Sequence, residues 1–273
     1  NFIDSIMYKN GSEITLIEEN EPTSLEVEVP PENMFGEPVV TDNDTQAKAN
    51  PEIPFYVHKE IDSIKNSARV YKKSVFVIAN RHKRGTLMGI DPVDFARTAW
   101  FREGMNDWHQ NNYLNSLIKY REAALVNRKF FLENQLKYGD YISVKKGNFK
   151  IDFFVAGVID LWPSIYPDEY PLVVGNLNYI QSQSVIEPFN VWINLKENKS
   201  ITPVMKKLKE NKIWVTGYRD SRKEIIEGKR EPQRMGLFGM LSIGFIISVI
   251  ITVFGYFLYN FLSLKRGCHS LGF

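Results

Sequence analysis

The sequence is poor in the residues that form covalent cross-links and metal sites. Its 273 residues include one cysteine, Cys268, so no disulfide can form within the chain. The four histidines, His58, His82, His109 and His269, lie far apart, and none has a second histidine or a cysteine at metal-ligand spacing. We therefore expect neither an internal disulfide nor a metal site.

The sequence also lacks the short motifs of common active sites. It has no phosphate-binding loop of the P-loop type, so we do not expect this chain to bind ATP itself. It has no dinucleotide-binding glycine fingerprint and no nucleophile elbow. Carboxylates are abundant, but no spacing selects a catalytic pair. The prediction is that the chain is not an enzyme and holds no cofactor.

Charge is absent from one long segment near the end of the sequence. No Asp, Glu, Lys, Arg or His occurs in residues 235–264, a run that as a helix would be about 45 Å long. Residues 241–260 include twelve Leu, Ile, Val or Phe side chains, which favour membrane insertion by roughly 4–7 kcal/mol. A buried core helix is the alternative. We predict a transmembrane helix over 235–264, followed by a short tail over 265–273.

Small side chains line one face of this predicted helix. Gly244, Ser248 and Thr252 recur at every fourth position, which would let a second helix approach closely. A helix that only anchors a domain needs no such face, although small residues are frequent in membrane helices in general. We predict that these three residues pack against another membrane helix.

The rest of the chain, residues 1–234, has no net charge, because it holds all 32 acidic residues and all but two of the 34 basic ones. This balance leaves no nucleic-acid footprint, and we expect no nucleic-acid partner. The charges are unevenly placed. The charged residues of 12–52 are mostly acidic, and those of 204–234 are mostly basic. Arg230 and Arg234 adjoin the apolar run, where they either contact lipid headgroups or form a solvated surface.

Alternating and helical spacings predict an α+β fold with a mixed sheet in the large domain, residues 1–234. We expect an exposed loop over 40–52, which is rich in Asp, Asn and Thr. The predicted strands are 24–29, 70–79, 85–90, 141–144, 149–159, 171–177, 189–195 and a short one at Trp214. The predicted helices are 55–68, one opening at Asp91, 112–122, 127–136 and one starting at Thr202.

Prolines at positions 163, 167 and 171 exclude helix and central strand from the segment DLWPSIYPDEYP. The resulting rigid loop carries three large aromatic side chains, Trp162, Tyr166 and Tyr170. Such amphipathic rings are common at interfaces, so the loop is a candidate partner-contact site. The alternative is that the rings pack the loop onto its own sheet.

Four segments of the sequence resemble the FtsX-like permeases of ABC transporters, a family that includes lipoprotein-releasing and macrolide-exporter subunits. The segments are GTLMGIDPVDFARTAWFR (85–102), ALVNRKFFLENQLKYGDYISV (124–144), FFVAGVIDLWPSIYP (153–167) and REPQRMGLFGMLSIGFIISVIITVFGYFLY (230–259). In that family a large extracytoplasmic domain lies between the first and second membrane helices. The resemblance implies that this chain is a fragment with that domain and the second helix, in the plasma or inner membrane, with 265–273 as a cytoplasmic tail.

The resemblance also implies partners and a mechanical function. A separate ABC ATPase subunit would bind the ATP, and a second permease copy or a homologue would complete the membrane part in contact with lipid. Movement of the helices would then shift the outer domain, for export, extrusion of lipid or lipoprotein, or signalling. Arg230, Pro232 and Arg234 would form the joint between domain and helix. The alternative function is a single-pass, membrane-anchored ligand-binding protein.

Overall fold

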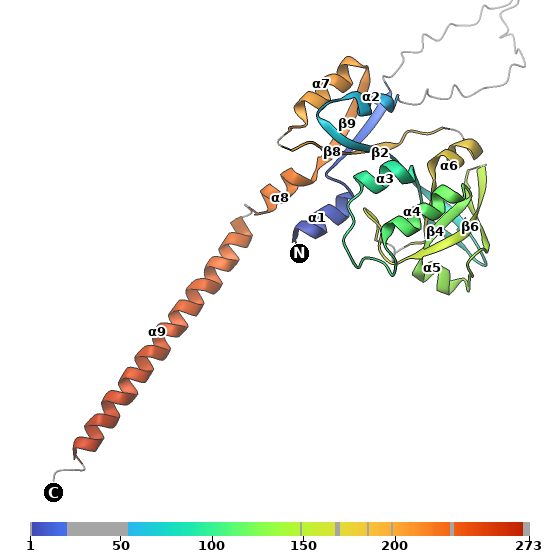
Figure 1. Cartoon of the computed structure of the whole chain (residues 1–273). Helices are drawn as coiled ribbons and strands as arrows, with labels where there is room; N and C mark the ends of the chain where they lie inside the picture. Colours follow the sequence, from blue (N-terminus) through green and yellow to red (C-terminus); the bar gives the residue numbers. More distant parts are fainter. Residues whose placement is uncertain are drawn as a thin grey trace, which may run out of the picture. The chain divides into compact units, whose positions relative to one another are not determined.

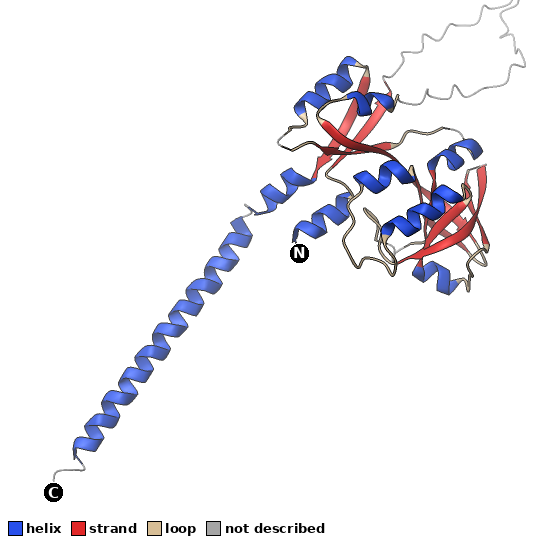
Figure 2. Cartoon of the chain, in the orientation of Figure 1, coloured by secondary structure: helices blue, strands red, loops and turns tan. Residues whose placement is uncertain are grey.

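The chain is an α+β protein with two compact units, Asn1–Arg222 and Lys223–Phe273, in the computed structural model (Figure 1). The α+β class and the mixed sheet predicted from the sequence are thereby confirmed. Among the described residues, all strands belong to the first unit (Figure 2). The structure describes residues 2–20, 54–147, 149–166, 170–184, 186–197, 199–229 and 232–269.

The elements alternate between strand and helix along the chain. In order they are α1 (Phe2–Asn10), β1 (Ile14–Asn20), α2 (Tyr56–Glu60), β2 (Ile64–Ile78), β3 (His82–Ile90), α3 (Pro92–Thr98), α4 (Gln110–Lys119), β4 (Ala123–Asn127), α5 (Arg128–Glu133), β5 (Tyr141–Lys146), β6 (Phe149–Ile159), β7 (Leu172–Asn176), α6 (Leu177–Gln183), β8 (Asn190–Leu195), α7 (Thr202–Glu210), β9 (Ile213–Asp220), α8 (Ser221–Lys229) and α9 (Pro232–His269).

Six strands of the first unit close into a barrel. Each is paired with two neighbours in the cycle β2–β3–β7–β4–β6–β5 and back to β2. The pairs β3–β7 and β4–β6 are parallel, and the other pairs of the cycle are antiparallel. The cycle closes at β2, whose residues 70–78 pair with β3 on one side while residues 76–78 pair with β5 on the other. Closure leaves these strands with no free edge.

The first half of β2 belongs to a second, open sheet. Residues 64–70 pair with β8, which pairs with β1, which in turn pairs with β9. With 15 residues, β2 is long enough to serve both the barrel and this sheet. Helix α7 packs beside β9 and buries Val204 and Leu208 in the core of the open sheet.

Two hydrophobic cores follow from the alternation of side chains along the barrel strands. One core fills the barrel interior with residues such as Val77, Phe153 and Val173, and it continues under the open sheet. Gly175 keeps room for the Phe153 ring there, since a Cβ would lie 2.8 Å from it. The second core lies outside the barrel, where α3 and α4 cover the outward side chains of β3, β4 and β7.

Several elements were predicted correctly. The strands 70–79 and 85–90 are the antiparallel pair β2–β3, and 141–144 and 149–159 are the pair β5–β6. Helix α3 begins at Pro92 directly after Asp91, because proline suits the first helical turn, although the Asp91 side chain forms no capping hydrogen bond. The predicted strand at 24–29 and the predicted loop at 40–52 lie outside the described residues.

Two predictions around short elements were wrong. Residues 55–68 form a helix only at Tyr56–Glu60, because β2 begins at Ile64 and pairs with β8. No strand was predicted between the helices at 112–122 and 127–136, yet Ala123–Asn127 is β4. All five of its residues are buried, so it has neither the alternation of a half-buried strand nor a helical period.

The second unit contains one long apolar helix. Helix α9 spans Pro232–His269, and its stretch Gly239–Asn260 is long and apolar enough to cross a membrane, with a mean hydropathy of 2.4. None of that stretch is buried in the structure, which distinguishes it from the alternative of a core helix. The predicted boundaries at 234 and 264 stay predictions.

Candidate functional site

The loop that follows β6 places its three predicted contact residues in different surroundings. Trp162 is fully buried. Its ring stacks on Phe95 with the centroids 5.7 Å apart and nearly parallel planes, and Phe101 meets it edge-on at 5.5 Å. Trp162 therefore fits the alternative interpretation, in which the loop is packed onto its own domain.

Tyr166 and Tyr170 remain at the surface, each 58% exposed. The Tyr166 ring lies 5.1 Å from the ring of Tyr8 on α1. Helix α1 is tied to the same loop by two hydrogen bonds, from the Tyr8 hydroxyl to the Ile165 carbonyl and from the Ser164 amide to the Tyr8 carbonyl. The buried Trp162 side chain therefore anchors the loop to its own domain, and the contacts with α1 fix the position of the loop's exposed end.

A second loop, residues 99–109, lines an open cavity of about 530 Å³ together with the first loop and α1. Tyr8, Trp100 and Tyr166 supply aromatic walls, and Arg102 is 3.5 Å from Asp4 at its edge. The other lining residues are Ser5, Glu103, Gly104, Met105 and Leu161. Another cavity, of about 580 Å³, is lined by residues 101–110. These surfaces make the paired loops the candidate binding site of the first unit.

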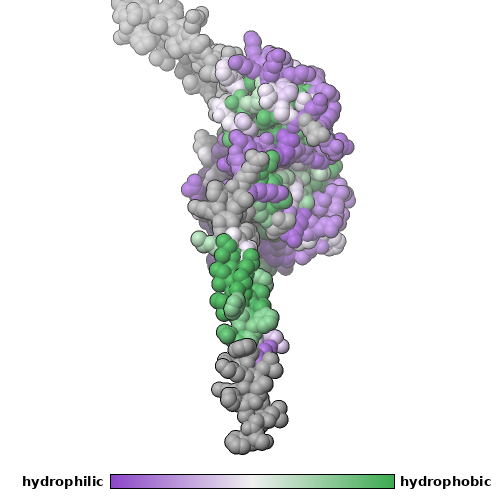
Figure 3. All heavy atoms as spheres, turned by 90° about the vertical axis from the view of Figure 1, so that its left-hand side faces the viewer, coloured by the Kyte–Doolittle hydropathy of each residue, from purple (hydrophilic) through white to green (hydrophobic). Residues whose placement is uncertain are grey.

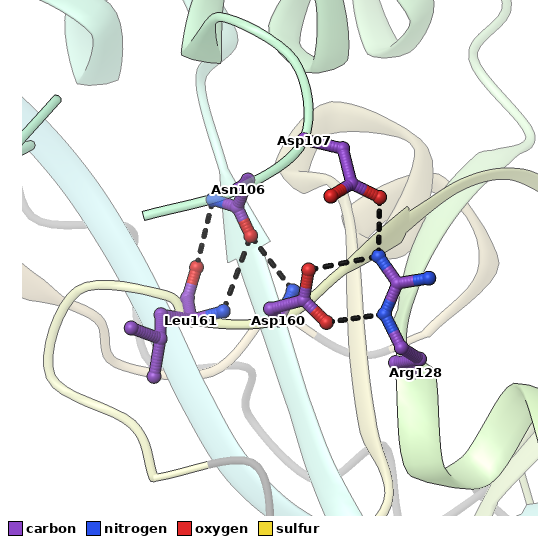
Figure 4. Close-up of polar contacts among 5 residues, drawn as sticks. All are labelled: Asn106, Asp107, Arg128, Asp160 and Leu161. Carbon is purple, nitrogen blue, oxygen red and sulfur yellow. Dashed lines mark hydrogen bonds and ion pairs between the residues drawn. The ribbon is translucent and has the colours of Figure 1, made fainter. Parts of the chain in front are cut away.

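A polar network joins the two loops and holds them in register (Figure 4). The Asn106 side chain accepts hydrogen bonds from the amides of Asp160 (2.7 Å) and Leu161 (3.1 Å) and donates one to the Leu161 carbonyl (3.0 Å). Arg128, at the start of α5, binds both oxygens of Asp160, with Nη2 2.8 Å from Oδ2, and also contacts Asp107. Such forked pairs fix orientation as well as position.

Arg128 keeps its positive charge in this network. The hydrogen bonds to Asp160 and, secondly, to Asp107 raise the pKa of the Arg128 guanidinium further above its usual value. No spacing rule could have found these residues, because Asn106, Arg128 and Asp160 come from three separate segments. In this region the sequence pointed only to Trp162 and Tyr166, because each precedes a proline of the predicted loop.

The chemistry of the paired loops suits binding. The cavity offers ring faces, two carboxylates and one guanidinium, and among the described residues that line it there is no histidine beside Ser5. Among the residues that the structure describes, no group of three or more His, Cys, Asp or Glu is arranged to hold a metal ion. The absence of an enzymatic function and of a cofactor stays a prediction.

The predicted packing face lies within the apolar stretch of α9. Thr252 donates a hydrogen bond of 2.8 Å to the Ser248 carbonyl one turn earlier, so its hydroxyl is satisfied inside the helix. Apart from the backbone of its own helix and its two chain neighbours, no atom of the described residues lies within 4 Å of the position where a Gly244 side chain would begin. Apolar side chains cover the visible side of this stretch (Figure 3). Packing against another membrane helix stays a prediction.

The predicted joint falls partly outside the described residues. Arg230 is not among them, and Pro232 is the first residue of α9. Arg234 lies in the first turns of the same helix. The role of these three residues as a joint stays a prediction.

The chain is similar to outer domains of known transporters among the solved structures. The extracellular domain of the noncanonic ABC-type transporter YknZ from Gram-positive bacteria is 13% identical over 75% of this chain and 98% of its own, with a TM-score of 0.44. The periplasmic region of MacB from Actinobacillus actinomycetemcomitans is 11% identical over 83% of this chain and 98% of its own, with a TM-score of 0.45. Both are outer domains, and the first comes from the transporter class that the sequence resemblance names.

No protein-family model matches the sequence, and the comparison with curated proteins gives no match. Identities of 11% and 13% with TM-scores below 0.5 carry no function from those structures to this chain. Its function has to be argued from its own residues.

Proposed function

We propose that this chain is part of the permease subunit of an ABC transporter and provides an extracytoplasmic domain with the membrane helix that follows it. The observation that carries the proposal is the direct succession of a folded α+β unit and the 22-residue apolar stretch of α9. At about 1.5 Å per residue this stretch is about 33 Å long, close to the thickness of a bilayer core. The resemblance of four sequence segments to FtsX-like permeases supports it.

In this proposal the chain acts mechanically. A separate ATPase subunit binds and hydrolyses ATP, because this chain has no phosphate-binding loop, and the chain itself needs no cofactor. Helix α9 transmits the resulting movement to the outer domain through the joint at Arg230, Pro232 and Arg234. The output is export, extrusion of lipid or lipoprotein, or a signal across the plasma or inner membrane.

The membrane part of the complex would hold at least one further helix against α9. Gly244, Ser248 and Thr252 provide the face for a second permease copy or a homologue, because small side chains permit close helix contact. Lipid covers the remaining apolar side chains of α9, which are exposed all along its length from Leu241 to Tyr259.

The side of the membrane on which Cys268 lies tests this proposal. In the full gene product, with any other cysteine replaced, a membrane-impermeant maleimide should label Cys268 only after the cells are permeabilised. A control variant, Lys209→Cys on the exposed surface of α7, should be labelled in intact cells. If Cys268 is labelled in intact cells and the Lys209→Cys variant is not labelled at position 209, the tail lies outside and the large domain inside. This result would overturn the proposal.

A single-pass anchored ligand-binding protein is the second candidate, favoured by the aromatic cavity beside Tyr166. The two functions differ in what they assemble with. A permease subunit extracted in mild detergent should copurify with an ABC ATPase encoded beside it and should change that enzyme's ATPase rate. An anchored binding protein should do neither.

A further inference from the structure

On one outer face of the barrel, the side chains of Ser74, Phe76, Arg84, Lys145 and Lys150 are exposed. This face is formed by β3, β2, β5 and the first half of β6, on the side away from the core that α3 and α4 cover. The pairings place four residues in one row across these strands: Arg84 opposite Phe76, Phe76 opposite Lys145, and Lys145 opposite Lys150. We call these four residues the cationic row.

The members of the cationic row project to the same side. Residues directly opposite each other in antiparallel strands share a face, and neighbours along a strand point the other way. Val75, Val77 and Val144, which flank the row along β2 and β5, are buried in the barrel interior. The row therefore faces solvent, where Phe76 is 57% exposed and the Lys150 side chain 58%.

Positive charge in the row exceeds what the surrounding residues compensate. Arg84 donates a hydrogen bond of 3.0 Å to the Ser74 hydroxyl, and among the described residues no carboxylate lies within ion-pair distance of Arg84 or Lys145. Lys150 is 3.3 Å from Asp152, which is the one acidic residue of this face within the part of the chain that the structure describes. The hydrogen bond from Ser143 and, after it, Lys150 lower the pKa of Asp152, so this carboxylate is ionised at neutral pH. Three cations thus face one anion.

We propose that the cationic row docks an extended acidic segment of a partner protein, in which two carboxylates flank an apolar residue at alternate positions. Four strands about 4.8 Å apart make the row about 14 Å long, and five residues of extended chain cover about the same length. In such a chain alternate side chains share a face, so one carboxylate reaches Arg84 and the other reaches Lys145 and Lys150. The central apolar side chain then covers the exposed ring of Phe76.

The surface fits a peptide segment better than a membrane. Proteins that lie on lipid bury several large apolar side chains in the headgroup region. On this face Phe76 and Tyr141 are 57% and 68% exposed, and of these two rings Phe76 belongs to the row. Ser74, Ser143 and Asp152 lie beside it and suit a hydrogen-bonding chain. A solvated ring between cations is also the arrangement of a small interface, with an aromatic centre and a charged rim.

The test uses the full-length protein in nanodiscs of zwitterionic lipid and a fluorescent peptide with glutamate, leucine and glutamate at alternate positions. Anisotropy should report binding that weakens with salt. Phe76→Thr should weaken it about tenfold or more, and Lys145→Glu about five- to tenfold. The matched control Lys209→Glu, an equal charge reversal on α7, should change it by less than about twofold, and a peptide with lysines for glutamates should not bind. Circular dichroism would verify that each variant is folded.

Three results would overturn the proposal. The first is no binding of the glutamate peptide, and the second is an equal loss of binding with Lys145→Glu and Lys209→Glu. The third is binding of phosphatidylglycerol vesicles that Lys145→Glu abolishes while the peptide does not bind, which would assign the row to a lipid surface. The assay needs no ATPase and no topology, so its failure is independent of the proposed permease function.

Discussion

At the scale of single residues, Trp162 and Tyr166 illustrate how position in a loop decides the role of an aromatic ring. They lie four residues apart, and each directly precedes a proline, so the local sequence does not distinguish them. In the structure Trp162 is stacked in the outer core, whereas Tyr166 is mostly exposed beside a cavity. The loop thus combines a buried side chain that fixes it to the domain with an exposed side chain that is available for binding.

Trp162→Ala should lower the free energy of unfolding of the first unit by about 3–5 kcal/mol, because it leaves a large void against Phe95 and Phe101. Tyr166→Ala should cost about 1 kcal/mol or less, since its ring is mostly in solvent. Thermal unfolding of the full-length protein in detergent, followed by near-ultraviolet circular dichroism, measures both. Equal losses for the two variants would contradict the assigned roles.

Tyr71 is the residue for which the structure predicts a distinct pH dependence. Burial and, secondly, the negative charge of Glu187 raise the pKa of its phenol well above its ordinary value. Its contribution to stability is full below pH about 10, where the unfolded chain ionises, and is lost as pH rises through the folded pKa. Between about pH 9 and 11, wild type and Tyr71→Phe should therefore show the same number of phenolates by ultraviolet absorbance. One fewer in Tyr71→Phe, with the fold intact, would refute this.

At the scale of elements, the local sequence pattern predicted those strands and helices that have one buried, apolar face and one exposed, polar face. The pair β2–β3, helix α3 and the pair β5–β6 have alternating or capped patterns and were found where expected. The pattern failed at β4, which is buried on both faces, and at the start of β2. There the partner strands, which local sequence does not record, decide the conformation.

Helix α9 permits an element-scale test of the small-residue face. If α9 packs at this face in the proposed permease, Gly244→Leu should reduce association of the chain with its membrane partner, because the added side chain would separate the helix backbones. Val253→Leu, on the opposite side of the helix, should have little effect. Cross-linking yield in native membranes measures association, and equal effects of the two substitutions would show that the face is not used for packing.

At the scale of the whole molecule, a folded unit rich in strands is followed by a unit dominated by one apolar helix. The first unit gains its stability from a closed barrel and two cores. The second depends on its surroundings, since the apolar side chains of α9 are exposed in the chain alone. This difference is what the proposed mechanical function requires of a domain and its membrane helix.

The joint at Pro232 provides the whole-molecule prediction. If α9 acts as a rod, a flexible Gly/Ser insertion before Pro232 should abolish most coupling between ATP hydrolysis and output, and Pro232→Ala should reduce it. The same insertion in the exposed turn between α7 and β9, at Asn211 and Lys212 of the first unit and away from the cationic row, serves as the control. Transport or signalling assays in cells measure the effect, and full activity of both joint variants would rule out the rod.

The sequence by itself determined the apolar helix, because the length and composition of a charge-free run decide whether it suits a bilayer. It also determined the α+β class, since alternation and helical spacing are local properties. The closed barrel, the burial of Trp162, the Arg128 network and the cationic row were decided only by the tertiary structure. Each of these features brings together residues that are distant in the chain. The register of the strands determines which residues meet, and that register depends on the packing of the whole core.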